Sequence, residues 1–201
     1  WLVWHLNLYN FMDGIDGLAS IEALSVCLGA ALIYVLLGFS AHSLVPVLLA
    51  AAVGGFLVWN FPPASIFMGD AGSGFLGVVI GALAIQAAWL SPKFLWCWCI
   101  LLGVFIVDAT WTLIRRLLRG VKVYEAHRSH AYQIASRRLG AHLPVTLLVL
   151  VVNLLWLLPI ALAVAFDWID GLGGLVLAYA PLIWVVVWLN AGGPEQTGVG
   201  G

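Results

Sequence analysis

Charged residues are scarce in this sequence, and their scarcity excludes most soluble folds. Asp, Glu, Lys and Arg make up 8% of the 201 residues, whereas a soluble domain carries about 25%. The hydrophobic share is 64% and the mean hydropathy is +1.09. A chain with so few charged residues cannot cover a water-exposed surface. The composition therefore predicts an all-α, polytopic transmembrane helix bundle. We expect membrane lipid around it and no nucleic-acid partner.

Cysteine is also rare, and its placement excludes a disulfide framework. The three cysteines, Cys27, Cys97 and Cys99, all lie in apolar runs. Cys97 and Cys99 are candidate metal ligands, but free cysteine more often packs as a small hydrophobe. We adopt the packing interpretation.

The two ends of the sequence lack features of a complete protein. The chain begins at Trp1, without Met, and has no signal-peptide pattern with a basic leading region. We therefore expect residues 1–190 to be the C-terminal part of one integral-membrane domain of a longer protein. Residues 191–201 offer nothing that could form a core, and we expect them to be a disordered tail.

Long apolar runs dominate what is present. A spanning helix needs about 20 mainly apolar residues, and six runs approach that length. A seventh run ends near Leu8, so we expect six to seven spans. The six runs are 17–39, 44–60, 74–90, 94–114, 143–166 and 172–189.

Positive charge is concentrated in one link between these runs. Seven of the eight Lys and Arg residues lie within residues 115–142. Cytoplasmic loops hold the excess of Lys and Arg, so this link is predicted to be cytoplasmic. Counting spans outward places residues 9–16 and 61–73 on the same side. Three polar motifs are therefore expected to form one composite site at the cytoplasmic surface.

The first polar motif, at residues 7–20, contains Asp-Gly pairs at Asp13 and Asp16. In a helix the two carboxylates would share a face, and in a loop the glycines would permit tight turns near a ligand. One acid could instead cap the following helix. A cap needs one acid, so the second Asp, together with Asn7 and Asn10, favours a functional interpretation.

The second motif, at residues 62–74, places Asp70 between Gly69 and Gly72, directly before an apolar run. Glycine-rich backbone at a helix start presents free N–H groups to anions, and an Asp in the same turn could hold Mg²⁺. An ordinary helix start has the same pattern. Taken alone, this motif supports the two interpretations equally.

The third motif, at residues 127–133, reads His-Arg-Ser-His-Ala-Tyr-Gln. His127 and His130 are candidate metal ligands, general bases or phosphate contacts. The surrounding arginines could instead enforce topology and contact anionic lipid headgroups. That alternative leaves the histidines unexplained. The arginines outside the motif are Arg115, Arg116, Arg119, Arg137 and Arg138.

Other acids have simpler interpretations. Asp108 is the acid of the 94–114 run, and Arg115 or Arg116 could pair with it. Glu22 lies one turn into a span, where a buried acid should face protein or water. The Asp170-Gly pair resembles the first motif but falls on the opposite side by the span count, so we interpret it as an ordinary hairpin turn.

The motifs together resemble those of the polyprenyl-phosphate N-acetylhexosamine-1-phosphate transferases of glycosyltransferase family 4, over residues 5–140. Residues 7–19 look like the family's Asn-x-x-Asn-x-x-Asp-Gly-x-Asp-Gly-Leu-Ala segment, and residues 67–73 like its Phe-Met-Gly-Asp-x-Gly-Ser segment. The run containing Asp108 looks like the helix that leads into the last catalytic loop. Residues 127–133 look like the histidine motif of the branch that starts O-antigen and related surface glycans.

The resemblance implies transfer of a sugar 1-phosphate from a UDP-N-acetylhexosamine-type donor to undecaprenyl phosphate, releasing UMP. It implies Mg²⁺, with Mn²⁺ as an alternative, and an active site facing the cytoplasm from the bacterial inner membrane. The product would initiate lipopolysaccharide O-antigen or a related cell-envelope glycan. Whether the protein forms a homodimer stays open.

The resemblance also implies roles for individual residues. The implied catalytic residues are Asp13, Asp16, Asp70, His127 and His130. The implied substrate contacts are Asn7, Asn10, Gly69, Arg128 and Ser129. The implied Mg²⁺ ligand is Asp70, with Asp13 as a second candidate.

One departure and two other classes of protein bear on this interpretation. The family carries an adjacent Asp-Asp pair on an earlier segment, and this sequence contains none, so we expect the chain alone to be inactive. An ion-coupled transporter would use Glu22 and Asp108 as coupling sites. Such acids should lie near the bilayer midplane, whereas the polar motifs here are expected together at one membrane surface. A lipid-binding assembly protein using the basic loop would leave Asp13, Asp16 and Asp70 without a role.

Overall fold

The computed structural model describes residues 1–121 and 128–194, and every regular element in these ranges is helical. This confirms the all-α expectation. The elements are α1 (Leu2–Met12), α2 (Leu18–Leu36), the 3₁₀ turn η1 (Ser40–Ser43), α3 (Leu44–Asn60), α4 (Gly69–Leu90), α5 (Pro92–Leu101), α6 (Gly103–Leu118), α7 (Ala131–Leu139), α8 (Leu143–Val152), the π-helical turn η2 (Asn153–Leu157), α9 (Leu158–Ala165) and α10 (Gly171–Trp188).

The described helices include enough long apolar segments for a polytopic membrane bundle. Five are long and apolar enough to cross a membrane, and counting the bent pair α5–α6 as one span gives six. Helix α1, which contains the run ending near Leu8, has 11 residues here and does not reach that length. The five segments are Leu18–Leu36, Ser40–Asn60, Gly69–Leu90, Leu143–Ala165 and Gly171–Trp188.

The run at residues 94–114, expected as one helix, is broken at Leu102. Helices α5 and α6 meet there at an angle of 73°. The Tyr179 hydroxyl of α10 donates a hydrogen bond to the carbonyl of Cys99 at 2.7 Å. A Cβ at Gly103 would lie 3.2 Å from the Tyr179 ring, so glycine gives α10 room to approach. Sharp bends arise where a side chain inserts into the helical hydrogen-bond ladder, and hydropathy carries no trace of such an insertion.

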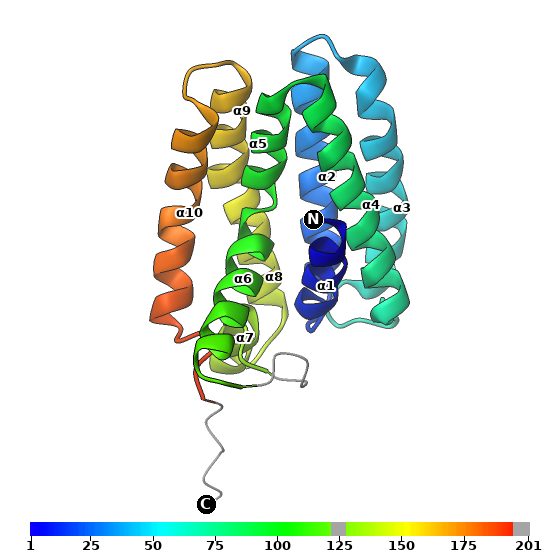
Figure 1. Cartoon of the computed structure of the whole chain (residues 1–201). Helices are drawn as coiled ribbons and strands as arrows, with labels where there is room; N and C mark the ends of the chain where they lie inside the picture. The colour runs from blue at the N-terminus through cyan, green and yellow to red at the C-terminus, as the bar shows by residue number, and fades with distance from the viewer. Residues whose placement is uncertain (122–127, 195–201) are drawn as a thin grey trace, which may run out of the picture.

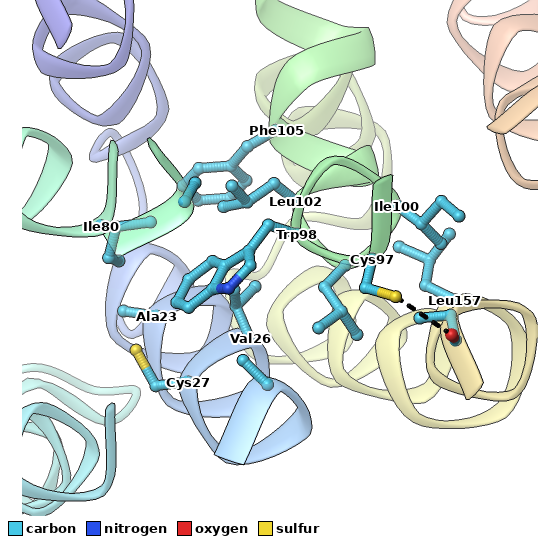
Figure 2. Close-up of a cluster of buried hydrophobic side chains, with 14 of the residues drawn as sticks. Ala23, Val26, Cys27, Ile80, Cys97, Trp98, Ile100, Leu102, Phe105 and Leu157 are labelled. Carbon is cyan, nitrogen blue, oxygen red and sulfur yellow. Dashed lines mark hydrogen bonds between the residues drawn. The ribbon is translucent and has the colours of Figure 1, made fainter. Parts of the chain in front are cut away.

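Trp98 of α5 lies at the centre of the buried core (Figure 2). It is 1% exposed, and its indole N–H donates to the Tyr34 hydroxyl of α2 at 2.9 Å. Figure 2 shows Val26 of α2, Ile80 of α4 and Phe105 of α6 around it. One side chain therefore joins four helices, and truncation to Ala would cost about 3–5 kcal/mol.

The cysteines pack as expected. Cys27 and Cys97 are buried, and the Cys97 thiol donates to the carbonyl of Ala161 at 3.4 Å (Figure 2). Within the described ranges, no three His, Cys, Asp or Glu residues are grouped so as to hold a metal ion. The packing interpretation of Cys97 is therefore the one that its contacts support.

The polar links gather at one end of the bundle (Figure 1). The turn after α1, the α3–α4 link, helix α7 and the end of α10 all lie there, while the α2–α3, α4–α5 and α9–α10 links lie at the opposite end. The expectation that the three motifs share one end is confirmed for their described residues. That this end faces the cytoplasm remains a prediction.

Candidate functional site

Asp13 and Asp70 come from different helices and lie close enough for their charges to repel. Asp13 is the residue that ends α1, and Asp70 lies in the first turn of α4. Burial, and secondarily the Asp70 carboxylate, raises the pKa of Asp13 to about 7. The negative end of the α1 dipole also disfavours a carboxylate there. A cation between the two acids would relieve this repulsion.

Asp70 stands on an open helix start. Its side chain is exposed, and the preceding Gly69 has φ +67°, a left-handed conformation that favours glycine. Nothing lies within 4 Å of a Cβ built at Gly69, so backbone conformation and not space selects glycine. The free N–H groups of this first turn suit an anion beside the Asp70 carboxylate.

Helix α1 packs directly against α4, which brings the first two motifs together. The Ser73 hydroxyl of α4 lies 3.5 Å from the Asn10 side-chain oxygen, to which it can donate. A Cβ at Gly77 would overlap the carbonyl of His5, so the backbones touch. Asn10 therefore lies at the junction of the two motifs. Asn7 instead donates to a carbonyl of its own helix at 2.8 Å.

Asp16 is held by contacts with the surrounding scaffold. One carboxylate oxygen accepts from the N–H of Ala64 at 3.1 Å and lies 3.2 Å from His142 Nδ1. Its backbone carbonyl accepts from the Thr146 hydroxyl at 2.8 Å. These contacts join the first motif to the α3–α4 link and to the start of α8. A cavity of about 400 Å³ lies beside Asp16, between the α3–α4 and α7–α8 links.

Asn60 organises the site, and the sequence analysis missed it. Its side-chain oxygen accepts from the N–H of Gly17 at 3.1 Å and from the Ser20 hydroxyl at 3.0 Å, and its amide donates to the carbonyl of Ile66 at 3.0 Å. The side chain therefore ties the first motif to the second. The one feature of the sequence that could have indicated this role is an amide side chain at the end of an otherwise apolar run.

Asp108 fixes the start of helix α7, which contains the last three residues of the third motif. Its two oxygens accept from the N–H groups of Ala131 at 2.9 Å and Tyr132 at 3.0 Å, and Thr112 donates to it at 3.1 Å. His130 Nδ1 lies 3.4 Å away. Asp108 is 4% exposed, so a buried carboxylate satisfies the otherwise unpaired N–H groups at the start of α7.

Tyr132 links helix α7 to the first motif. Its hydroxyl donates to the carbonyl of Phe11 at 2.9 Å. A Cβ at Gly14 would overlap this hydroxyl, so the Asp13-Gly14 turn requires glycine to let Tyr132 approach. The third motif thereby reaches the Asp13 turn through one side chain.

The arginines of α6 have roles that differ from those expected. Arg115, considered as a partner of Asp108, donates to the carbonyl of Ala191 at 2.9 Å, and Arg119 donates to that of Gly192 at 2.8 Å. Arg116 is 6% exposed, too buried to contact lipid headgroups as proposed for it.

The chain after α10 is held against this arginine cluster. The N–H of Gly192 donates to the carbonyl of Ser129 at 2.8 Å, and Ala191 is fully buried. Residues 191–193 of the expected disordered tail are therefore buried, whereas Pro194 is exposed. Residues 195–201 lie outside the described residues.

The remaining residues of the third motif are only partly described. His127 lies outside the described residues, so its catalytic role stays a prediction. Arg128 is exposed, and its carbonyl accepts from Arg137 Nη2 at 2.7 Å. Ser129 and His130 are 3% and 2% exposed. Both residues are therefore packed inside the protein, where they support the fold of the third motif.

Comparison with known sequences identifies this arrangement of motifs. Residues 1–88 match glycosyl transferase family 4. The chain is 37% identical over 137 residues to the probable undecaprenyl-phosphate N-acetylglucosaminyl 1-phosphate transferase of Bacillus subtilis (strain 168), which is 66% of this chain and 37% of the relative. Both comparisons support the resemblance to glycosyl transferase family 4.

Two further relatives carry different names. Identity is 45% over 85 residues with the phospho-N-acetylmuramoyl-pentapeptide-transferase of Moorella thermoacetica, covering 42% of this chain and 27% of the relative. Identity is 39% over 97 residues with the decaprenyl-phosphate N-acetylglucosaminephosphotransferase of Mycolicibacterium smegmatis, covering 41% of this chain and 22% of the relative. The matches thus span between 22% and 37% of these curated relatives' lengths.

The family match covers the acidic half of the site. Residues 1–88 include the first and second motifs, whereas α7 lies beyond them. The resemblance to family 4 is confirmed, and the O-antigen branch stays a prediction. The part of the candidate site that lies on α7 is supported by its contacts with the first motif.

At the opposite end of the bundle, Asp170 caps α10. One of its carboxylate oxygens accepts from the N–H of Gly173 at 2.9 Å, and the neighbouring Asp167 pairs with Lys93 at 2.9 Å. The interpretation of this Asp-Gly pair as an ordinary hairpin turn is confirmed.

Glu22 is enclosed within the bundle. Its carboxylate accepts from the Asn153 amide at 2.7 Å, and the same amide donates to the Ser25 hydroxyl at 2.8 Å. Glu22 is fully buried, and Asp108 is bound to α7. The contacts of both acids are structural, so the transporter alternative has no support.

Proposed function

We propose that the protein containing this chain transfers a sugar 1-phosphate from a nucleotide sugar to a polyprenyl phosphate. The observation that carries the proposal is the meeting of Asp13 and Asp70 beside the open start of α4, 57 residues apart in sequence. The named reactions of the family 4 relatives, on undecaprenyl- and decaprenyl-phosphate, support the reaction class.

The residues present fit a magnesium ion. Mg²⁺ prefers oxygen ligands and usually takes one or two carboxylates together with substrate phosphates. Asp13 and Asp70 offer two carboxylates, and burial together with the charge of Asp70 raises the pKa of Asp13. Mn²⁺ accepts the same ligands. Such an ion would neutralise charge on the pyrophosphate of the donor.

The chain itself would bind and align two polyanions. Phosphoryl transfer depends mainly on positioning and charge stabilisation. The first turn of α4 offers N–H groups, and Asn10 lies between the two acidic motifs. Asp108 and Tyr132 fix α7, which holds His130 and the adjoining Arg128 at the same end. Asp16 shapes the turn through Ala64 and His142.

The finer assignment follows the sequence motifs. The donor is a UDP-sugar of the N-acetylhexosamine type, the acceptor undecaprenyl phosphate and the second product UMP. The protein lies in the bacterial cytoplasmic membrane with the site facing the cytoplasm, as the concentration of Lys and Arg in residues 115–142 indicates. The product begins O-antigen or a related cell-envelope glycan.

The test is UMP release by the complete natural protein in detergent, with UDP-N-acetylglucosamine, undecaprenyl phosphate and MgCl₂. Asp70→Asn should lower turnover at least about 100-fold, because it removes a charge that the transition state requires. Asp170→Asn is the matched control. It changes the same residue type at a helix start on the other end, and Asn caps a helix equally well, so turnover should stay at the wild-type level. Full activity in Asp70→Asn would refute the proposed site.

A further inference from the structure

A basic cavity lies between α7 and the chain that follows α10. Its volume is about 460 Å³, and three arginines, Arg128, Arg137 and Arg138, line it. Leu189 and Pro194 form an apolar part of the wall. The cavity has the size of a small-ligand site and three positive charges around it.

The described lining of the cavity is basic. None of its described lining residues is acidic. Arg137 donates to the carbonyl of Arg128 at 2.7 Å, and the Arg138 guanidinium lies 5.4 Å from the centre of the Trp188 ring. These contacts fix the side chains of Arg137 and Arg138 and involve no carboxylate. Guanidinium groups held in this way recognise phosphate.

The cavity lies on a different side of α7 from the acidic motifs. Tyr132 points towards the end of α1, where its hydroxyl meets Phe11. Arg138 follows six residues later, about 240° further around a helix. An anion in this cavity is therefore separated from the Asp13–Asp70 pair by the helix itself.

The surroundings of the cavity indicate a membrane lipid and not a soluble anion. Trp184 and Trp188 on the last two turns of α10 are 66% and 63% exposed and stack at 6.3 Å. Exposed tryptophans at the end of a spanning helix mark the headgroup level of a bilayer. Arg138 lies over Trp188, so the cavity opens at this level beside an apolar helix surface.

We propose that this cavity binds the phosphate group of an anionic bilayer phospholipid, with Arg137 and Arg138 as ligands and the acyl chains along α10. The chemistry recognised is a phosphate ester or phosphate. A soluble phosphate is the other source of that chemistry, and the lipid is favoured by the tryptophans and the apolar helix surface. The inference does not depend on the proposed transfer activity.

Native mass spectrometry of the full chain, released from nanodiscs, tests the lipid site. With equal amounts of phosphatidylglycerol and phosphatidylcholine, the wild type should retain phosphatidylglycerol preferentially. Arg137→Gln and Arg138→Gln should each lower that retention about five-fold. Lys93→Gln removes the same charge at the opposite end of the bundle and should leave retention unchanged. Equal losses in all three variants, or no loss in the arginine variants, would overturn the proposal.

Two further arms separate folding and ligand source. Arg138→Lys keeps the charge and should keep most of the retention, whereas a loss equal to that of Arg138→Gln, with unchanged melting temperature, would contradict recognition by charge. Inorganic phosphate added at the lipid's concentration should leave phosphatidylglycerol bound. Complete displacement by inorganic phosphate, or equal retention of phosphatidylcholine, would show that the lipid is not the ligand.

Discussion

Replacing Asp108 with Ala should release helix α7 from α6 while leaving the rest of the bundle folded. The Asp108 carboxylate accepts from two backbone N–H groups at the start of α7, at 2.9 and 3.0 Å, in a setting where the side chain is 4% exposed. Each buried donor left unsatisfied costs about 1–3 kcal/mol. Two donors together give a local destabilisation of about 3–4 kcal/mol.

Hydrogen–deuterium exchange is the suitable assay, because it resolves local opening. A loss of about 3 kcal/mol corresponds to roughly 100-fold faster exchange, since 1.4 kcal/mol changes an equilibrium constant ten-fold. The acceleration should be confined to residues 131–139. Asp108→Asn retains one acceptor oxygen and should show a smaller acceleration.

Two variants serve as controls. Thr112→Val removes a donor to Asp108 but keeps both backbone hydrogen bonds, so α7 should exchange less than about ten times faster. Asp170→Ala removes a helix cap on α10 and should loosen only the start of that helix. If α7 in Asp108→Ala exchanges at the wild-type rate, the carboxylate does not hold the helix.

Three further changes have defined outcomes. The pKa of Asp13 is raised to about 7, so between about pH 4 and pH 7 the folded protein binds a proton that the unfolded chain has released. Without metal, the free energy of unfolding should therefore fall as pH rises through that window. Asp13→Asn should flatten the dependence of the melting temperature on pH. Added MgCl₂ should raise the melting temperature more at pH 8 than at pH 6, and an equal rise at both would argue against Asp13 as a ligand. Gly14→Ala should destabilise by about 2–3 kcal/mol through its overlap with Tyr132, and combining it with Tyr132→Phe should recover part of the loss in chemical denaturation. Tyr179→Phe removes the hydrogen bond to Cys99 and should cost about 1 kcal/mol, measured as urea unfolding in mixed micelles; no change would mean that the bend does not depend on this bond.

The membrane fold was predictable because hydropathy and span length determine it directly. The gathering of the polar motifs at one end was also predictable, because antiparallel spans of known number alternate sides. The break at Leu102 was not, because both halves of the run are equally apolar. The Tyr179 hydroxyl that contacts α5 next to the break comes from a residue 80 positions further along the chain.

The site was predictable by residue type but not by contact. Asp13 and Asp70 were recognised from their glycine neighbours, and the structure brings their charges together. Of the two neighbouring arginines expected as partners of Asp108, Arg115 instead donates to the carbonyl of Ala191. Asp108 is bound by backbone N–H groups 23 and 24 residues away. Asn60 was missed because an isolated amide at the end of an apolar run has no distinctive pattern.

The segment after α10 looks expendable in the sequence, and its contacts show otherwise. The N–H of Gly192 binds the carbonyl of Ser129, and a Cβ on Gly192 would come within 2.9 Å of the carbonyl of Thr112. A truncation designed from composition would cut at residue 190 and remove this clasp. A protein shortened at residue 190 should therefore show the same defects as a protein mutated in the third motif, although the cut lies some sixty residues downstream of that motif. Shortening after Pro194 spares the clasp and is the safer boundary for fusion to a reporter.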